Sequence, residues 1–156
     1  MNKHHHFIQQ AIDLASANII HGGGPFAALI VRDGKIIATG VNQVTLNNDP
    51  TAHAEIVAIR AACAILADFS LEGCTLYSSC EPCPMCLAAI YWARISHLFF
   101  GAGHEDAGRA GFRDEFIYTE LALPIQERSL QTNQLKRQEA LTPFQLWDES
   151  ELKTTY

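Results

Sequence analysis

The sequence lacks an apolar run long enough to cross a bilayer, and it lacks an apolar leader at its start. Its apolar runs fall far short of the roughly 20 residues that a spanning helix needs. The opening residues, MNKHHHFIQQ, hold no signal-peptide core. Repeats, low-complexity segments and linkers rich in glycine, proline or serine are also missing. We therefore expect a single cytoplasmic domain over residues 1–156, without a membrane partner.

Positive charge is scarce as well. The chain has 11 Lys and Arg residues against 17 Asp and Glu residues, a formal net charge of −6. Binding to a phosphate backbone depends on neutralisation by Lys and Arg, so this balance is unfavourable for a nucleic-acid partner. We expect a small-molecule partner and no nucleic acid.

Cysteine is present in an odd number, five, which argues against a disulfide framework. Three of the five stand at three-residue intervals in SSCEPCPMC, residues 78–86. An iron–sulfur cluster of the bacterial type needs another cysteine four residues after the third, but position 90 is isoleucine and no cysteine follows Cys86. A structural zinc knuckle with His53 as fourth ligand and a catalytic zinc with an open position remain.

Apolar periodicity and turn residues predict a three-layer α/β/α domain with a central mixed sheet. Helical spacing runs from Phe7 to Ile20, and two apolar runs flank Asp33-Gly34, a favoured hairpin dipeptide. We take Asp49-Pro50 as the start signal of a helix reaching residue 66. Further expected elements are strands at 74–79 and 97–102, helices at 84–94 and 114–122, an edge strand at 131–138 and a helix from residue 143.

The candidate metal-binding residues stand where two of these elements are expected to begin. The Asp49-Pro50 signal places His53 and Glu55 at a helix N-terminus, and Cys83 and Cys86 share one face of the next helix's first turn. His-x-Glu followed by Pro-Cys-x-x-Cys is the signature of zinc deaminases. Three protein ligands leave one position for water, and a carboxylate beside it can move the proton. Cys80 is interpreted as a core residue.

With these motifs the chain resembles the cytidine deaminase superfamily and, within it, the bacterial guanine deaminases. The likeness spans nearly the whole chain and is strongest in NDPTAHAEIVAIR (48–60) and SSCEPCPMCLAAIYWAR (78–94). The blocks AGFRDEFIY (110–118) and LTPFQLW (141–147) and the terminal tyrosine point to the guanine-specific branch. The resemblance implies hydrolysis of guanine to xanthine and ammonia with one zinc ion (Zn2+) per chain.

The resemblance also implies the site residues. His53, Cys83 and Cys86 would bind zinc, Glu55 would shuttle protons, and the purine would be held by Asn42, Asp114, Phe26 and Trp92, with Asp114 counted among the catalytic residues. Judged by residue type alone, these last four have plain alternatives: a turn for Asn42, a helix N-cap for Asp114, and core positions for the two aromatic residues.

Three rival functions stay open: a tRNA adenosine deaminase, a cytosine deaminase of the same superfamily, and a non-enzymatic zinc module. The module would not require Glu55, and the sparse cations Lys136, Arg137 and Lys153 make a poor phosphate track. We expect a homodimer, since a small domain leaves a sheet face and an edge strand to cover. We also expect the tail to fold over an active site, its own or the partner's, with Tyr156 sealing the pocket.

Overall fold

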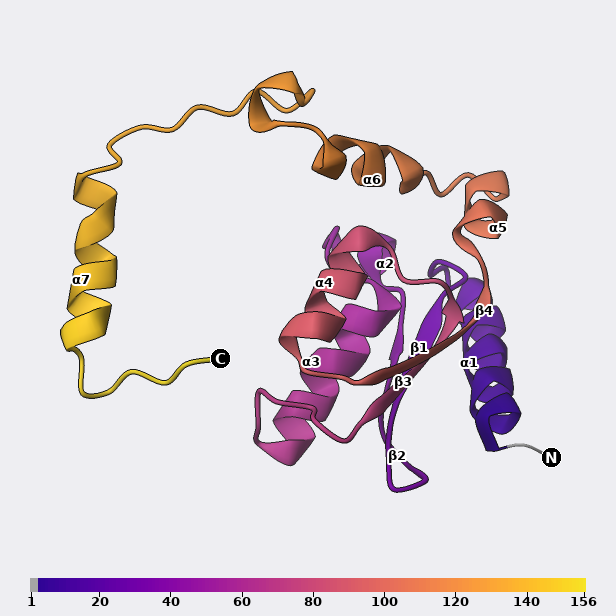
Figure 1. Ribbon diagram of the computed structural model, residues 1–156. Helices are drawn as coiled ribbons and strands as arrows, with labels where there is room; N and C mark the ends of the chain where they lie inside the picture. The colour runs from indigo at the N-terminus through magenta and orange to yellow at the C-terminus, as the bar shows by residue number, and fades with distance from the viewer. Residues whose placement is uncertain (1–2) are drawn as a thin grey trace. The chain divides into compact units, whose positions relative to one another are not determined.

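The computed structural model describes residues 3–156, which form two compact units (Figure 1). The first unit extends to Glu115, and the second runs from Phe116 to Tyr156. Within residues 3–156, none of the helices combines the length and the apolar character that crossing a membrane requires.

A mixed four-stranded sheet forms the centre of the first unit. Its strands are β1 (Ala27–Arg32), β2 (Lys35–Val41), β3 (Thr75–Cys80) and β4 (His97–Ala102), in the order β2-β1-β3-β4. Strand β1 is antiparallel to β2 and β3, whereas β3 and β4 are parallel. The β1–β2 turn has both Asp33 and Gly34 at positive φ, 51° and 74°, as the favoured two-residue hairpin turn requires. The predicted hairpin and mixed sheet are confirmed.

Helices cover both faces of this sheet. Helix α1 (Lys3–Ile20) packs on one face through Leu29 and Val31, while α3 (Ala54–Leu66) packs on the other through Ala28 and Ile30. Alternate residues of one strand point to opposite faces, so this division shows the predicted three-layer arrangement. Helix α4 (Pro84–Trp92) lies beside α3 (Figure 1).

Helix α1 begins four residues before the predicted start at Phe7. The ring of His4 stacks on Phe99 at a centroid distance of 4.3 Å, and its Nδ1 lies 2.8 Å from the Tyr77 hydroxyl. These contacts with β3 and β4 extend the helix into a histidine-rich segment that apolar periodicity does not mark.

The predicted start signal of α3 is wrong in detail. The Asp49 carboxylate accepts hydrogen bonds from the Thr51 amide at 2.8 Å and from the Thr51 hydroxyl at 2.7 Å, so it closes its own turn instead of capping the helix. The helix starts at Ala54, with His53 as its extended N-cap. Two short helices, α2 (Val44–Asn47) and α5 (His104–Arg109), have no counterpart in the predicted elements.

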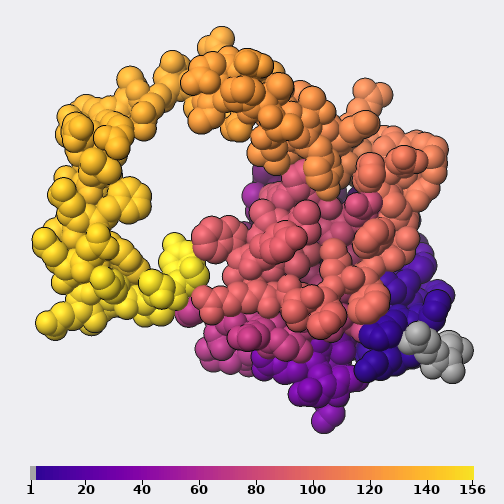
Figure 2. Space-filling model, in the orientation of Figure 1, coloured from indigo at the N-terminus to yellow at the C-terminus, as the bar shows by residue number. Residues whose placement is uncertain are grey.

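The second unit follows the start of α6 (Glu115–Ala122) and contains two 3-10 turns, Ile125–Glu127 and Glu139–Leu141, and α7 (Thr142–Glu149). The two helices fall where they are predicted, with Pro143 in the first turn of α7. The edge strand predicted at 131–138 is wrong, because in the described chain that segment has no strand pairing. Among the described residues, α6, α7 and the two turns bury no side chain. Figure 2 draws this unit in orange to yellow.

Candidate active site

The site lies at the N-terminus of α3, against the end of β2. A Cβ atom on Gly40 of β2 would come within 2.2 Å of the Ala54 carbonyl oxygen and 2.5 Å of the Ala58 nitrogen. Glycine at position 40 therefore lets the first turns of α3 lie directly against the sheet. The first residues of α3 are consequently fixed relative to the strand that ends at Val41. His53, the N-cap, and Glu55, in the first turn, share the end of the helix as the sequence predicts.

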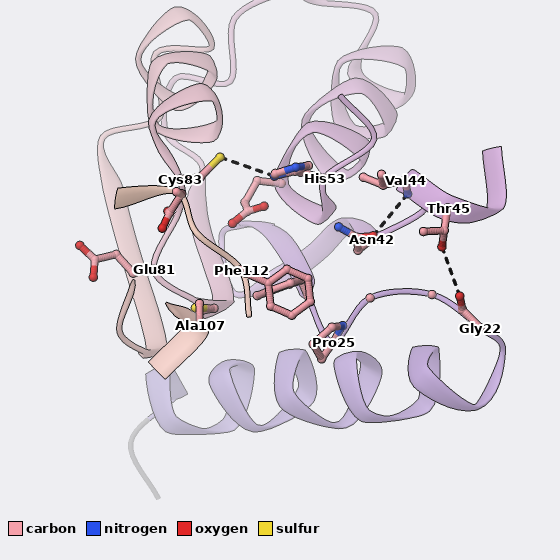
Figure 3. A pocket seen from close by; sticks show the side chains of 16 residues that line it. Gly22, Pro25, Asn42, Val44, Thr45, His53, Glu81, Cys83, Ala107 and Phe112 are labelled. Atoms are coloured by element: carbon pink, nitrogen blue, oxygen red, sulfur yellow. Dashed lines mark hydrogen bonds between the residues drawn. The ribbon is translucent and has the colours of Figure 1, made fainter. Parts of the chain in front are cut away.

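The two cysteines come from the start of α4. Cys83 is the extended N-cap, Pro84 follows in the first turn, and Cys86 is buried within it. The Cys83 sulfur lies 3.5 Å from Nδ1 of His53 (Figure 3). The Cys86 sulfur lies 3.6 Å from the same nitrogen. The ligand atoms of these three residues all lie within 4.8 Å of one another, and within residues 3–156 no other His, Cys or acidic group joins them. Cys80 is outside the cluster.

The spacing of these atoms fits a zinc ion. Bonds of about 2.3 Å to sulfur and about 2.0 Å to imidazole nitrogen, at tetrahedral angles, separate nitrogen from sulfur by about 3.5 Å. The distances of 3.5 and 3.6 Å from Nδ1 of His53 to the two sulfur atoms agree with this nitrogen–sulfur separation. Nδ1 of His53 is the nitrogen that faces both thiols, so it is the atom placed to bind the metal.

The electrostatics of the metal-free cluster favour one shared thiol proton. The hydrogen bond between the thiol groups of Cys83 and Cys86, helped by one between Cys83 and His53, lowers the pKa of Cys83 to about 4. The same hydrogen bond raises the pKa of Cys86, and burial raises it further. The bond to Cys83 also raises the pKa of His53. Because metal ligands bind as thiolates and neutral imidazole, loading the site releases protons.

Glu55 is held beside the cluster in a buried position. Its carboxylate accepts a hydrogen bond of 3.1 Å from the Ser78 hydroxyl of β3, whose side chain is 1% exposed. Burial raises the pKa of Glu55, although bonds from its own backbone amide, Cys86 and Ser78 oppose that shift. A carboxylate with a raised pKa is a stronger base than an ordinary one, so it accepts a proton more readily and can return it.

A cavity of about 460 Å³ opens onto His53, Glu55 and Cys83. Asn42 lies on its wall directly after β2, and its Oδ1 accepts the Val44 amide at 3.3 Å (Figure 3). The turn interpretation of Asn42 and the binding interpretation are thus compatible, because the oxygen closes the turn and the amide nitrogen stays available as a donor. The polar lining also includes Asp114, Glu81 and Cys80.

Two aromatic rings meet on the cavity wall. Phe26 and Phe112 pack edge to face, with centroids 4.7 Å apart and planes at 81°. Phe112 is absent from the site residues predicted from the sequence. It stands two residues before Asp114 in the block AGFRDEFIY, and that proximity is the signal that points to it.

Trp92 does not lie on this wall. Trp92 ends α4, at the opposite end from Cys83, is 66% exposed and is not one of the described residues that line the cavity. Within the first unit, Phe112 rather than Trp92 therefore faces Phe26. Tyr156 belongs to the second unit. The assigned roles of Trp92 and Tyr156 stay predictions.

Comparison with known proteins agrees with this geometry. Residues 1–102 match the family described as the cytidine and deoxycytidylate deaminase zinc-binding region. The chain belongs to the cytidine and deoxycytidylate deaminase family. It is 54% identical to a guanine deaminase of Bacillus subtilis (strain 168) over 145 residues, which are 92% of this chain and 93% of that protein.

A solved structure and a more distant relative complete the comparison. The X-ray structure of guanine deaminase from Bacillus subtilis matches with a TM-score of 0.96 and 52% identity, covering 100% of this chain and 99% of that one. A tRNA-specific adenosine deaminase of Buchnera aphidicola subsp. Baizongia pistaciae is 44% identical over 65% of this chain and 62% of its own length. The likeness to the tRNA enzyme therefore covers less of this chain.

Proposed function

We propose that the protein is a zinc-dependent hydrolase that converts guanine and water to xanthine and ammonia. The observation that carries the proposal is a triangle of His53, Cys83 and Cys86 with zinc spacing, with buried Glu55 beside it in a cavity lined by Asn42 and Asp114. The 54% identity to a guanine deaminase over 92% of the chain supports the choice of substrate.

His53, through Nδ1, and the thiolates of Cys83 and Cys86 hold one zinc ion per chain. When bound, zinc lowers the pKa of water to about 7 and so supplies a nucleophile at neutral pH. Cys80 is not a ligand. Burial raises the pKa of its thiol to about 11, and its sulfur lies 3.7 Å from the Gly103 carbonyl oxygen, which is the environment of a neutral thiol.

Glu55 moves the protons of the reaction. It takes the first proton of the attacking water and gives it to the ring nitrogen. It then takes the second proton from the new hydroxyl group on the ring carbon and gives it to the departing amine, so two protons are accepted and two are returned on ammonia release. The Ser78 hydroxyl holds one carboxylate oxygen, which limits the orientations of Glu55. The raised pKa of Glu55 suits a group that is protonated and deprotonated within one turnover.

The base is selected and held by Asn42, Asp114 and the two phenylalanines, Phe26 and Phe112. Guanine carries ring N–H and amine donors together on one edge, so the Asp114 carboxylate can accept from that edge. The free amide nitrogen of Asn42 donates to a ring acceptor, because its oxygen already bonds Val44. Phe26 and Phe112 form an apolar wall for the flat ring. Adenine lacks the paired donor edge and would leave buried polar groups unpaired.

The alternative of a tRNA adenosine deaminase is weaker. None of the described residues that line the cavity is a lysine or an arginine, and the formal net charge of the chain is −6. A nucleotide flipped out of an anticodon loop needs cations for its phosphates. We therefore propose a free purine base as partner, with no nucleic acid. The family description names cytidine and deoxycytidylate, so a cytosine deaminase stays the other alternative.

We also propose that two copies of the chain form a homodimer. Large apolar side chains of the second unit are more than half exposed, among them those of Phe116, Leu121, Phe144 and Tyr156. Side chains of this kind need a surface to cover them. We place the tail over an active site with Tyr156 sealing it, and we assign exposed Trp92 to the same closed site. Both units then form one deaminase domain. A cytoplasmic location is supported by the five cysteines, which are all free.

The test is ammonia release from the zinc-loaded protein with a panel of guanine, adenine, cytosine, adenosine and an anticodon stem-loop RNA. Guanine is expected to be the best substrate by a wide margin. Light scattering at micromolar concentration is expected to give the mass of a dimer. A monomeric protein that still turns over guanine would remove the dimer while leaving the chemistry in place.

A further inference from the structure

Asn18 is a buried polar residue whose bonds all lead to the cavity wall. It lies in the last turn of α1, is 5% exposed, and continues the buried face formed by Phe7, Ala11 and Ala15. Its position on an apolar helix face gives no indication of a role in the site. None of the atoms of Asn18 lines the cavity.

The side-chain amide of Asn18 joins two separate segments of the wall. Its Nδ2 donates to the Gly24 carbonyl oxygen and to the Asn42 carbonyl oxygen, each at 2.8 Å. The backbone carbonyl of Asn18 also accepts the Gly23 amide at 3.0 Å. Both segments line the cavity, the first through Gly22–Phe26 and the second through Asn42.

The bonds continue into the residues that would contact the base. The Phe26 amide donates to the same Gly24 oxygen at 2.9 Å, and the Asn42 amide donates to the Phe26 carbonyl oxygen at 3.0 Å. Asn18, Gly24, Phe26 and Asn42 thus form a closed ring of hydrogen bonds behind the wall. Such a ring restrains the aromatic wall and the amide donor together.

Glycine at positions 23 and 24 is required by this arrangement. A Cβ atom on Gly23 would lie 2.3 Å from Nδ2 of Asn18, and one on Gly24 would lie 2.9 Å from Oδ1 of Asn42. The loop therefore packs directly on the two asparagine amides. A side chain at residue 23 would displace the amide that holds the ring.

We propose that Asn18 is a positioning residue for the purine: its amide ties the glycine loop to Asn42 and so sets the distance between the Phe26 wall and the Asn42 donor. This inference rests on the proposed function. Asn18 acts through Phe26 and Asn42 and does not touch the base. Its loss weakens guanine binding while leaving the zinc ligands in place, because His53, Cys83 and Cys86 make none of these bonds.

The first test measures binding without turnover. Zinc-loaded Glu55→Gln protein is compared with the same protein carrying Asn18→Ala. The guanine Kd is expected to rise roughly tenfold, because the Phe26 wall and the Asn42 donor are no longer held at the spacing that fits the base. Ala15→Gly on the same helix face lowers the melting temperature without removing a bond of Asn18, so its Kd should stay within about twofold. An unchanged Kd in Asn18→Ala, or an equal rise in Ala15→Gly, overturns the proposal.

The second test changes Gly23, which packs on the Asn18 amide, instead of Asn18 itself. Gly23→Ala should raise the guanine Kd as Asn18→Ala does, and the double variant should be no weaker than either single one, because both remove the same restraint. Zinc content should stay at one per chain in all three. Effects that multiply in the double variant would overturn the proposal.

A third measurement does not depend on the substrate. Hydrogen exchange at the Phe26 and Asn42 amides should be faster in Asn18→Ala than in Ala15→Gly. Unchanged exchange would refute the restraint itself. If the parent Glu55→Gln protein binds no guanine while exchange at these amides responds to Asn18→Ala, the proposed substrate fails and the restraint stands.

Discussion

Ser78 and Ser79 are adjacent serines of β3 that offer a matched test of how Glu55 is held. Their side chains alternate across the strand, and each makes one buried hydrogen bond. The Ser78 hydroxyl donates to Glu55 at 3.1 Å, whereas the Ser79 oxygen accepts the Ala27 amide at 3.1 Å. Removing the first bond changes the environment of the Glu55 carboxylate, and removing the second changes only the β1–β3 packing.

The size of the effect follows from the type of bond. A hydrogen bond to a charged group contributes about 1.5–3 kcal/mol, which corresponds to a change of roughly 10- to 150-fold. Ser78→Ala should therefore lower kcat for guanine by roughly 10- to 100-fold, with KM changed far less. Ser79→Ala leaves a buried amide unpaired and should lower the free energy of unfolding by about 1–3 kcal/mol with kcat preserved.

The assay is steady-state ammonia release at saturating guanine, with zinc content and melting temperature measured on the same samples. The reasoning predicts a lower kcat for Ser78→Ala and a lower melting temperature for Ser79→Ala. Equal kcat values for the two variants, at full zinc content, would refute the role of Ser78.

Further predictions concern the metal, the carboxylate and the wall. Cys83→Ser should lose zinc by elemental analysis while Cys80→Ser keeps it, and the opposite ranking would reverse the ligand assignment. Glu55→Gln should keep zinc and guanine binding but lower turnover by roughly 10²- to 10⁴-fold, so near-normal turnover would contradict its proton role. Burial raises the pKa of Glu55 in the folded protein above its ordinary value of 4.5. In metal-free protein the contribution of Glu55 to the free energy of unfolding is therefore complete below pH 4.5, and it is lost as the pH rises through the folded pKa. The melting temperature of metal-free protein should therefore fall relative to Glu55→Gln on raising the pH, and parallel melting curves would argue against a buried Glu55. Phe112→Ala should raise the guanine KM roughly 5- to 100-fold through lost stacking, with Phe112→Leu intermediate, and an unchanged KM would exclude Phe112 from the wall.

The cluster of His53, Cys83 and Cys86 could be predicted from the sequence because its geometry is local. Cys83 and Cys86 are three residues apart at a helix start, and His53 and Glu55 stand at another, so element boundaries alone bring each pair together. The start signal itself was wrong, since the Asp49 side chain bonds its own turn in preference to the helix. The error does not affect the candidate site, because the helix still begins directly after His53.

The cavity wall could not be predicted in the same way. Phe112 reaches Phe26 across 86 positions of sequence, and Asn18 reaches Asn42 across 24, so neither contact leaves a local pattern. The strand expected at 131–138 rested on residue preference, which has no effect without a neighbouring strand to pair with.

The measurement that most directly tests the function is the ratio of kcat/KM for guanine to that for adenosine in an anticodon stem-loop, on zinc-loaded protein and on Asp114→Asn. The account predicts a ratio far above one that falls when the Asp114 carboxylate becomes an amide, because the paired donor edge of guanine then loses its acceptor. Faster turnover of the RNA adenosine or of cytosine than of guanine would contradict it.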